Sequence, residues 1–150
     1  MTIRLSVIDS GVEEIAQHLS GDDLQRIALI TDSGFDFCGQ IIAALERVGT
    51  VSVIDIYAHA IPGCLQLAGG RYGADEVATD ALAWERIGQK IEPTGAIHLY
   101  ACQAGAGSAG TMFLDGLHAS SQRSVAAATD LVGSAELGGG WILEIGRAHV

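Results

Sequence analysis

Short apolar runs alternate along this chain with segments in which apolar residues recur at helical spacing. Four times a run of strand length precedes such a segment, from residues 3–10 followed by 12–19 to residues 95–103 followed by 108–120. Apolar strands that alternate with amphipathic helices are typical of a mostly parallel sheet covered on both faces by helices. The pattern therefore predicts a three-layer α/β/α sandwich.

The pattern changes in two places. After the predicted strand 51–60, the turn-rich segment 61–75 delays the next helix, which is expected over residues 76–91. After the fourth helix, residues 124–132 and 138–146 have strand character and are joined by a glycine-rich segment, which predicts a C-terminal β-hairpin. No repeat or linker interrupts the chain, so residues 1–150 are expected to form a single domain.

The charge and the cysteine content of the chain exclude several classes of partner and of site. The formal net charge of -10 argues against nucleic acid and against an anionic membrane as partner, because both require clustered Lys and Arg. No apolar run reaches the ~18 to 20 residues of a membrane span, and the first residues lack a signal-peptide pattern, so we expect a soluble chain. Three cysteines without CxxC spacing make a disulfide framework improbable.

In parallel sheets, catalytic groups gather at the carboxyl ends of the strands. His59 and Cys102 end two consecutive major strands of the predicted sheet. Cysteine catalysis needs a thiolate, a nearby base and backbone N–H donors for the oxyanion. The pattern predicts Cys102 as nucleophile and His59 as base, with the amides of Ala60 and Cys102 forming the oxyanion hole.

Carboxylates at the same edge offer a weaker prediction about the substrate. Asp32, Asp36 and Asp130 lie near predicted strand ends, where they could form an acidic pocket for an Arg or Lys side chain. The alternative role of these residues is turn formation and helix capping.

The run Gly105 to Gly110 matches the G-x-G-x-x-G dinucleotide fingerprint, and Asp130 stands where a ribose-binding acid would be expected. Only about forty residues follow the run, too few for the β-α units that normally come after this fingerprint. We therefore interpret these glycines as residues that permit a tight turn and close packing of a helix on the sheet, and we expect no cofactor.

A zinc site is a second alternative. It would use His59, Cys64 and Cys102 as three ligands. Strong zinc sites show tighter, paired ligand spacing, so no metal is predicted.

Three segments carry a resemblance to a known family. These are "IYAHAIPGCLQLAGG", "IHLYACQAGAGSAG" and, above all, "VAAATDLVGSAELGGGWILE". They resemble a bacterial domain family of undefined function, found mostly in giant calcium-binding adhesins and other repeat-rich surface proteins. That family is similar to the caspase-like fold of clan CD cysteine peptidases, which includes caspases, gingipains, separases and CHAT domains.

The resemblance implies a caspase-like sandwich with a His59/Cys102 dyad that hydrolyses peptide bonds. The substrate would be a peptide or protein, including the parent chain of a larger exported surface protein that processes itself. The chain departs from the family pattern at Ala60 and Ala101, where relatives carry glycine. A second hypothesis is therefore a catalytically inactive caspase-fold domain that serves in assembly, retention or interaction of a surface protein.

Overall fold

A computed structural model of the chain describes residues 3–12, 26–31, 36–129 and 143–148. The strands of the central sheet are β1 (Arg4–Asp9), β2 (Arg26–Thr31), β3 (Val51–Tyr57), β7 (Ile91–Tyr100), β8 (Ser124–Ala127) and β9 (Ile145–Arg147). The helices are α1 (Phe37–Val48), α2 (Ala74–Thr79), α3 (Ala81–Gln89) and α4 (Gly107–Ser121). A smaller sheet consists of β4 (His59–Ile61), β5 (Cys64–Leu67) and β6 (Gly70–Gly73).

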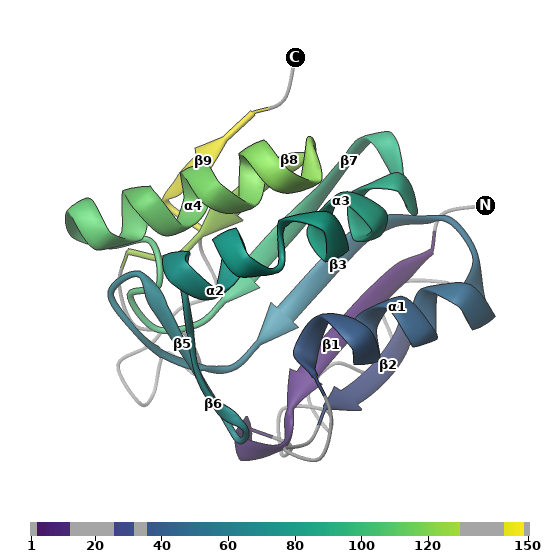
Figure 1. The fold of residues 1–150 in the computed structure, drawn as a ribbon, viewed down its shortest axis with the longest axis horizontal. Helices are drawn as coiled ribbons and strands as arrows, with labels where there is room; N and C mark the ends of the chain where they lie inside the picture. The colour runs from purple at the N-terminus through teal and green to yellow at the C-terminus, as the bar shows by residue number, and fades with distance from the viewer. Residues whose placement is uncertain (1–2, 13–25, 32–35, 130–142, 149–150) are drawn as a thin grey trace.

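The central sheet has six strands in the order β2-β1-β3-β7-β8-β9 (Figure 1). Neighbours from β2 to β8 pair in parallel, and β9 alone pairs antiparallel, with β8. The mostly parallel sheet with flanking helices confirms the predicted α/β/α class. The antiparallel pairing of β8 with β9 confirms that the two C-terminal strands are partners, and most of the segment between them lies outside the described residues.

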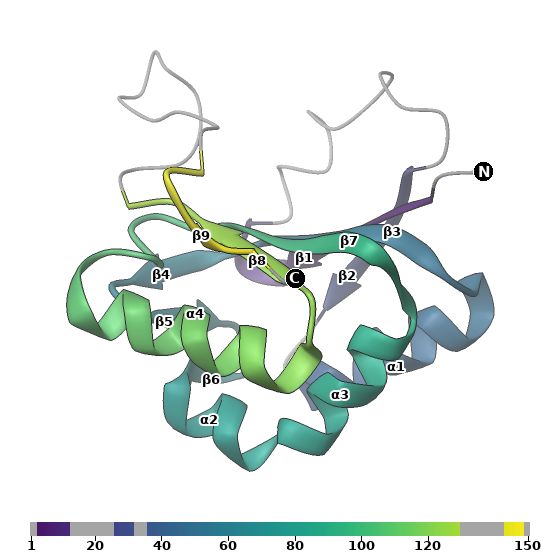
Figure 2. The ribbon, with the colours of Figure 1, turned by 90° about the horizontal axis from the view of Figure 1, so that it is seen from above.

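The four described helices lie on one face of the central sheet (Figure 2). Buried apolar side chains of the sheet, among them Leu5, Ile54 and Leu99, pack with those of the helices into the main core. The helix expected over residues 12–19 lies almost entirely outside the described residues. No helix within the described ranges is both long and apolar enough to cross a membrane.

Helix α1 illustrates how the sequence sets an element. Asp36 begins it as the N-cap, with its carboxylate accepting a hydrogen bond from the Gly39 N–H at 2.8 Å. Cys38, Ile41 and Leu45 recur at helical spacing and are buried against the sheet. Gly49, with φ of 93°, follows the last turn.

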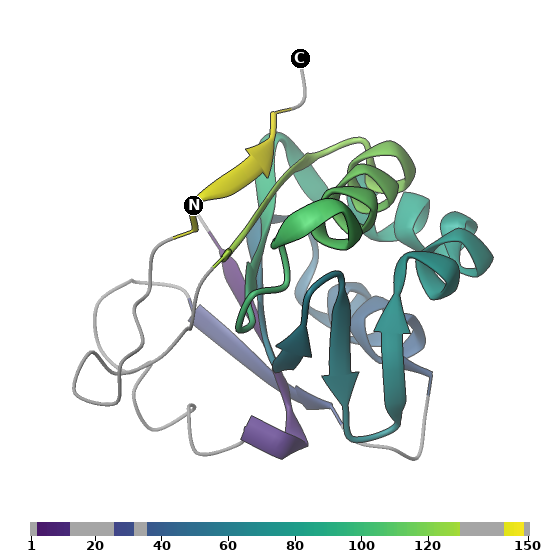
Figure 3. The same cartoon turned by 90° about the vertical axis from the view of Figure 1, so that its left-hand side faces the viewer.

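The segment 61–75 differs from the prediction, because it contains two strands where only a turn-rich interruption was expected. Strands β4, β5 and β6 form an antiparallel meander that stands on the helix side, at the carboxyl ends of the central strands (Figure 3). Leu65 and Tyr72 are buried on its inner face. These strands are only three or four residues long, and β6 begins and ends with glycine. The alternation of apolar and polar residues is therefore too short to predict them from the sequence.

Candidate functional site

His59 and Cys102 follow two neighbouring strands at the same edge of the sheet. Strands β3 and β7 pair in parallel, and their last partners are Tyr57 and Tyr100. His59 and Cys102 each lie two residues beyond these partners, and the N–H of Ala58 donates to the Tyr100 carbonyl at 3.5 Å, which continues the pairing. The structure thus brings together the two chain segments that the sequence assigned to one site.

The last paired residues of β3 and β7, Tyr57 and Tyr100, also contact each other through their side chains. The rings of Tyr57 and Tyr100 stack with centroids 5.0 Å apart and planes 11° apart. Tyr57 is buried with Ile8 and Val12, and Tyr100 packs against that cluster. The stacked tyrosines therefore come directly before the two candidate residues, of which His59 is exposed and Cys102 half-buried.

The turn after His59 determines where the Ala60 amide points. Pro62 and Gly63 connect β4 to β5, and the φ of 74° at Gly63 in second place after proline is typical of a type II turn. Ile61 and Cys64 close this turn, so the alternation of an antiparallel ladder makes Ala60 and Leu65 a non-hydrogen-bonded pair. The N–H of Ala60 accordingly points away from β5.

The loop after Cys102 is anchored beside β4. The Ala104 carbonyl accepts a hydrogen bond from the Gly63 N–H at 3.0 Å, and Gly105 donates to the Ala128 carbonyl at 2.8 Å. Gln103 has a φ of 59°, a left-handed conformation that is uncommon for a residue other than glycine and that clusters at functional sites. Ala60 and Ala101 have no positive φ, so alanine is compatible with the backbone at both positions.

Asp9 joins the end of β1 to this site, and the sequence did not single it out for that role. Asp9 is only 3% exposed, and its carboxylate accepts hydrogen bonds from the N–H groups of Gly11, at 2.9 Å, and Ala68, at 3.0 Å. A Cβ placed on Gly11 would lie 2.9 Å from Asp9 Oδ2 and 3.7 Å from Cδ2 of His59. Asp9 therefore holds the loop that borders His59 and the tip of the β5–β6 turn (Figure 3).

We predict that Asp9→Ala lowers the free energy of unfolding by about 1–3 kcal/mol, because it leaves two backbone N–H groups without their acceptor. Amide hydrogen exchange at Ala68 should accelerate more than exchange in α1. Asp36→Asn is the matched control, since asparagine caps a helix as well as aspartate does. Unchanged protection at Ala68 in Asp9→Ala would contradict the anchoring role.

The glycine run serves packing, as interpreted from the sequence. A Cβ at Gly110 would lie 2.1 Å from the backbone of Gly105, and one at Gly105 would lie 2.5 Å from the Ile145 side chain. Both positions therefore allow α4 to approach the loop and the sheet closely.

The three acidic residues predicted to bind substrate are not brought together within the described structure. The carboxylate of Asp36 caps α1. Asp32 and Asp130 lie outside the described residues. A pocket for a basic side chain stays a prediction.

The other two cysteines occupy different environments. Cys38 is fully buried, which raises the pKa of its thiol to about 12, and its sulfur lies 3.3 Å from the Tyr72 hydroxyl. Cys64 is buried at the start of β5. Within the described ranges, no group of three His, Cys, Asp or Glu side chains could hold a metal ion, so His59, Cys64 and Cys102 are not gathered as zinc ligands.

A cluster of polar side chains, Arg4, Asp55 and His98, lies on the neighbouring strands β1, β3 and β7. Asp55 is fully buried, and its oxygens accept from Arg4 Nε at 2.6 Å and Arg4 Nη2 at 3.0 Å. His98 Nδ1 lies 3.3 Å from Asp55 Oδ1. Burial by itself raises the pKa of Asp55, but His98 and Arg4 lower it more, so the net pKa lies below its ordinary value.

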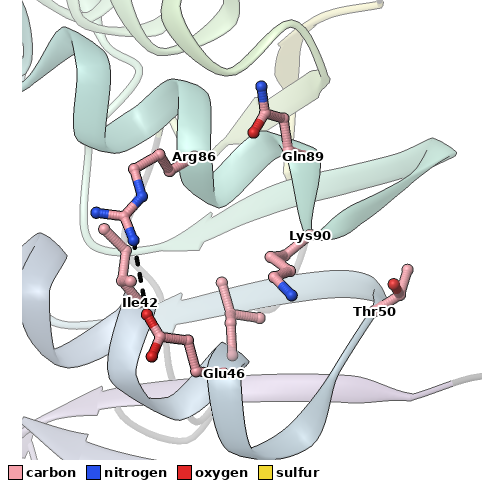
Figure 4. A pocket seen from close by; sticks show the side chains of 7 residues that line it. Ile42, Glu46, Thr50, Arg86, Gln89 and Lys90 are labelled. Atoms are coloured by element: carbon pink, nitrogen blue, oxygen red, sulfur yellow. Dashed lines mark ion pairs between the residues drawn. The ribbon is translucent and has the colours of Figure 1, made fainter.

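A hollow of about 220 Å³ lies at the opposite end of the strands, between α1 and α3. It is lined by Ile42, Leu45, Glu46, Thr50, Arg86, Gln89 and Lys90 (Figure 4). Arg86 and Glu46 form an ion pair of 3.6 Å across it. Its volume is below the ~300 Å³ at which small-molecule sites begin, and it lies at the amino ends of the strands, away from the carboxyl ends, so we do not assign it a ligand.

Comparisons with known proteins give a family and no activity. No curated protein matches the chain. Two solved structures of small-chain dehydrogenases, the second in complex with NADPH, are similar at 12% identity, with TM-scores of 0.42 and 0.41. The similarity covers 79% of this chain and 65% and 62% of theirs, less than two thirds of either dehydrogenase. The model of a domain of unknown function, DUF4347, matches residues 5–150, and the chain belongs to that family.

Proposed function

We propose that this domain is a cysteine peptidase of the caspase-like, clan CD type, with Cys102 as nucleophile and His59 as general base. The observation that carries the proposal is the register of β3 and β7, which places both residues two positions beyond a paired tyrosine. Side chains at adjacent strand ends of a parallel sheet share one edge, where catalytic groups gather. The left-handed Gln103 after Cys102 adds support, because backbone strain clusters at functional sites.

The proposed reaction proceeds in two steps. His59 takes the proton of the Cys102 thiol, the thiolate attacks the peptide carbonyl, and the oxyanion accepts hydrogen bonds from the amides of Ala60 and Cys102. When the C–N bond breaks, His59 gives its proton to the departing amine and an acyl-enzyme remains. Water then attacks the thioester as His59 takes its proton, and the thiol of Cys102 is restored with release of the acid.

The substrate in this proposal is a peptide segment, the parent chain of a surface protein included. The β4 edge next to Cys102 supports an extended substrate, since a peptide can add to a sheet edge through backbone hydrogen bonds. The Ala60 N–H, which points away from β5, is one such group.

Selective alkylation tests the proposal directly. We expect iodoacetamide at pH 6 to label Cys102 at least tenfold faster than Cys38 or Cys64, because a neighbouring base raises the fraction of reactive thiolate. Labelling at each cysteine is measured by mass spectrometry of the digested protein. Cys38 is the internal control, since its pKa of about 12 keeps it protonated.

A histidine variant shows whether Cys102 reacts fast because His59 activates its thiol or only because the thiol is accessible to the reagent. His59→Ala should slow the labelling of Cys102 toward the rate of an ordinary exposed thiol, whereas His118→Ala, a loss of histidine on α4, should not. Equal and slow labelling of all three cysteines would contradict catalysis and favour the non-catalytic module.

A further inference from the structure

The inner face of the small sheet carries a row of side chains that leads from Ala60 to Tyr72. Ala60 of β4 lies opposite Leu65 of β5, which lies opposite Tyr72 of β6. Leu65 and Tyr72 are buried in the main core, and Ala60 packs against it. Because residues directly opposite one another in antiparallel strands project from the same face, the three side chains form one continuous row.

The Tyr72 hydroxyl is held at the far end of this row by two hydrogen bonds. It accepts one from Trp84 Nε1 at 2.8 Å and donates one to Asp80 Oδ2 at 2.7 Å. Trp84 belongs to α3, and Asp80 is the residue between α2 and α3. The Cys38 thiol of α1 lies 3.3 Å from the hydroxyl, a weaker contact because sulfur is a poor hydrogen-bond partner. Asp80 and Trp84 therefore connect β6 to the helical layer.

Aromatic contacts restrict the ring of Tyr72 as well. The centroid of the Phe37 ring lies 5.3 Å from that of Tyr72, and the centroid of the Trp84 ring lies 6.4 Å from it in an edge-on arrangement. Tilted and edge-on ring pairs at such distances are favourable. Burial raises the pKa of the Tyr72 hydroxyl, which therefore stays protonated and keeps its hydrogen bond to Asp80 near neutral pH.

The strand ladder transmits the position of Tyr72 to the Ala60 amide. Leu67 and Gly70 close the turn between β5 and β6, so alternation makes Leu65 and Tyr72 a hydrogen-bonded pair. Ala60 and Leu65 form the other type of pair, in which the side chains approach more closely. A shift of Tyr72 would therefore move Leu65 and, through it, the Ala60 N–H.

We infer that Tyr72 is a positioning residue for the oxyanion hole, because its hydrogen bonds to Asp80 and Trp84 hold the small sheet where the Ala60 N–H meets the carbonyl under attack. This inference rests on the proposed peptidase function and deepens it. A donor stabilises an oxyanion only at hydrogen-bond distance, so a small displacement of the Ala60 N–H is costly. Tyr72 acts through Ala60 and is not itself a catalytic residue.

Two small reagents distinguish the oxyanion hole from the nucleophile. p-Nitrophenyl acetate acylates a thiolate through a tetrahedral oxyanion, whereas iodoacetamide alkylates a thiolate by direct displacement and forms none. Acylation is measured as the release of p-nitrophenol in excess of that from Cys102→Ala, and alkylation as labelling of Cys102 by mass spectrometry. Loss of a whole oxyanion donor costs about 10²- to 10³-fold, so a displaced donor in Tyr72→Phe should slow acylation by about tenfold. Alkylation of Cys102 should change by less than about twofold, because the thiolate and His59 are untouched.

Asp80 provides a second test, which decides the matter if Tyr72→Phe does not fold by circular dichroism. Asp80→Ala removes the acceptor of the Tyr72 hydroxyl and should slow acylation in the same selective way. Asp80→Asn keeps an acceptor oxygen and should hold acylation within about twofold of the unmodified rate. Ser121→Ala is the matched control, because it removes a buried hydroxyl that donates to the Leu117 carbonyl within α4, and both rates should be unchanged.

The possible outcomes distinguish the role of Tyr72 from the peptidase function. Acylation within about twofold of the unmodified rate in the folded Tyr72 and Asp80 variants would overturn the role of Tyr72 while the peptidase stands. An equal fall of acylation and alkylation would also overturn it, because the thiolate and not the oxyanion hole would then be affected. Fast alkylation of Cys102 in the unmodified domain without p-nitrophenol release would show that no oxyanion hole forms there, which overturns the inference. Absence of release together with equal and slow alkylation of all three cysteines would overturn the proposed function itself.

Discussion

Cys102→Ala is expected to abolish covalent labelling by peptidyl electrophiles and to lower peptide turnover by about ten-thousandfold or more, because the acyl-enzyme can no longer form. His59→Ala should lower turnover by about 10²- to 10⁴-fold, the usual contribution of a general base. Turnover is measured with a mixture of fluorogenic peptides that differ in the residue before the cleaved bond.

A variant that carries both substitutions tests whether His59 and Cys102 act together. If the two residues act as one unit, His59→Ala combined with Cys102→Ala should be no slower than Cys102→Ala alone. Cys38→Ser is the control for loss of a thiol, since Cys38 lies on the buried face of α1 and is hydrogen-bonded to Tyr72. Turnover that survives in Cys102→Ala, with the protein folded, would exclude Cys102 as nucleophile.

That β3 and β7 are parallel neighbours ending at one edge of the sheet was predictable from the sequence, because it depends on local pattern and one general rule. Apolar runs locate β3 and β7, and parallel neighbours end at the same edge of the sheet. The glycine run was likewise interpretable, since the structure places Gly105 and Gly110 where a Cβ would meet backbone or core atoms.

The small sheet and the residues on it were not predictable in the same way. Strands of three or four residues give too little alternation to be distinguished from turns. Gln66 becomes a neighbour of His59 only through the cross-strand register, and Asp9 becomes one only through hydrogen bonds to Gly11 and to the distant Ala68. A single sequence does not contain those long-range pairings.

The Arg4, Asp55 and His98 cluster was missed for a related reason. Each residue lies within an apolar strand where it looks like an isolated polar interruption. Only the order β1-β3-β7 brings the three side chains onto neighbouring strands. A buried carboxylate in such a place requires partners, and the structure supplies two.

Asp55→Ala should therefore be among the most destabilising single substitutions in the chain. It removes a fully buried carboxylate and leaves the Arg4 guanidinium and the His98 ring without the acceptor that lies between them. Breaking a buried ion pair from one side costs about 3–5 kcal/mol. For a domain of this size, we expect the midpoint of thermal unfolding to fall by roughly 10 °C or more.

The comparison variant is Asp115→Ala, which removes the exposed ion pair of 2.7 Å between Asp115 and Arg147. Exposed pairs contribute about 0–1 kcal/mol, so this variant should unfold within a few degrees of the unmodified domain. Equal destabilisation by the two substitutions would show that burial of Asp55 does not set its contribution.

The pH dependence gives an independent measure of the same cluster. Because the pKa of Asp55 is lower in the folded state than its ordinary value of 3.8, its stabilising contribution is complete above that value and is lost as the pH falls through the lower folded pKa. The difference in unfolding free energy between the unmodified domain and Asp55→Asn, measured by urea denaturation, should therefore shrink between pH 5 and pH 2. A difference that stays constant over this range would mean that ionised Asp55 gains nothing from Arg4 and His98.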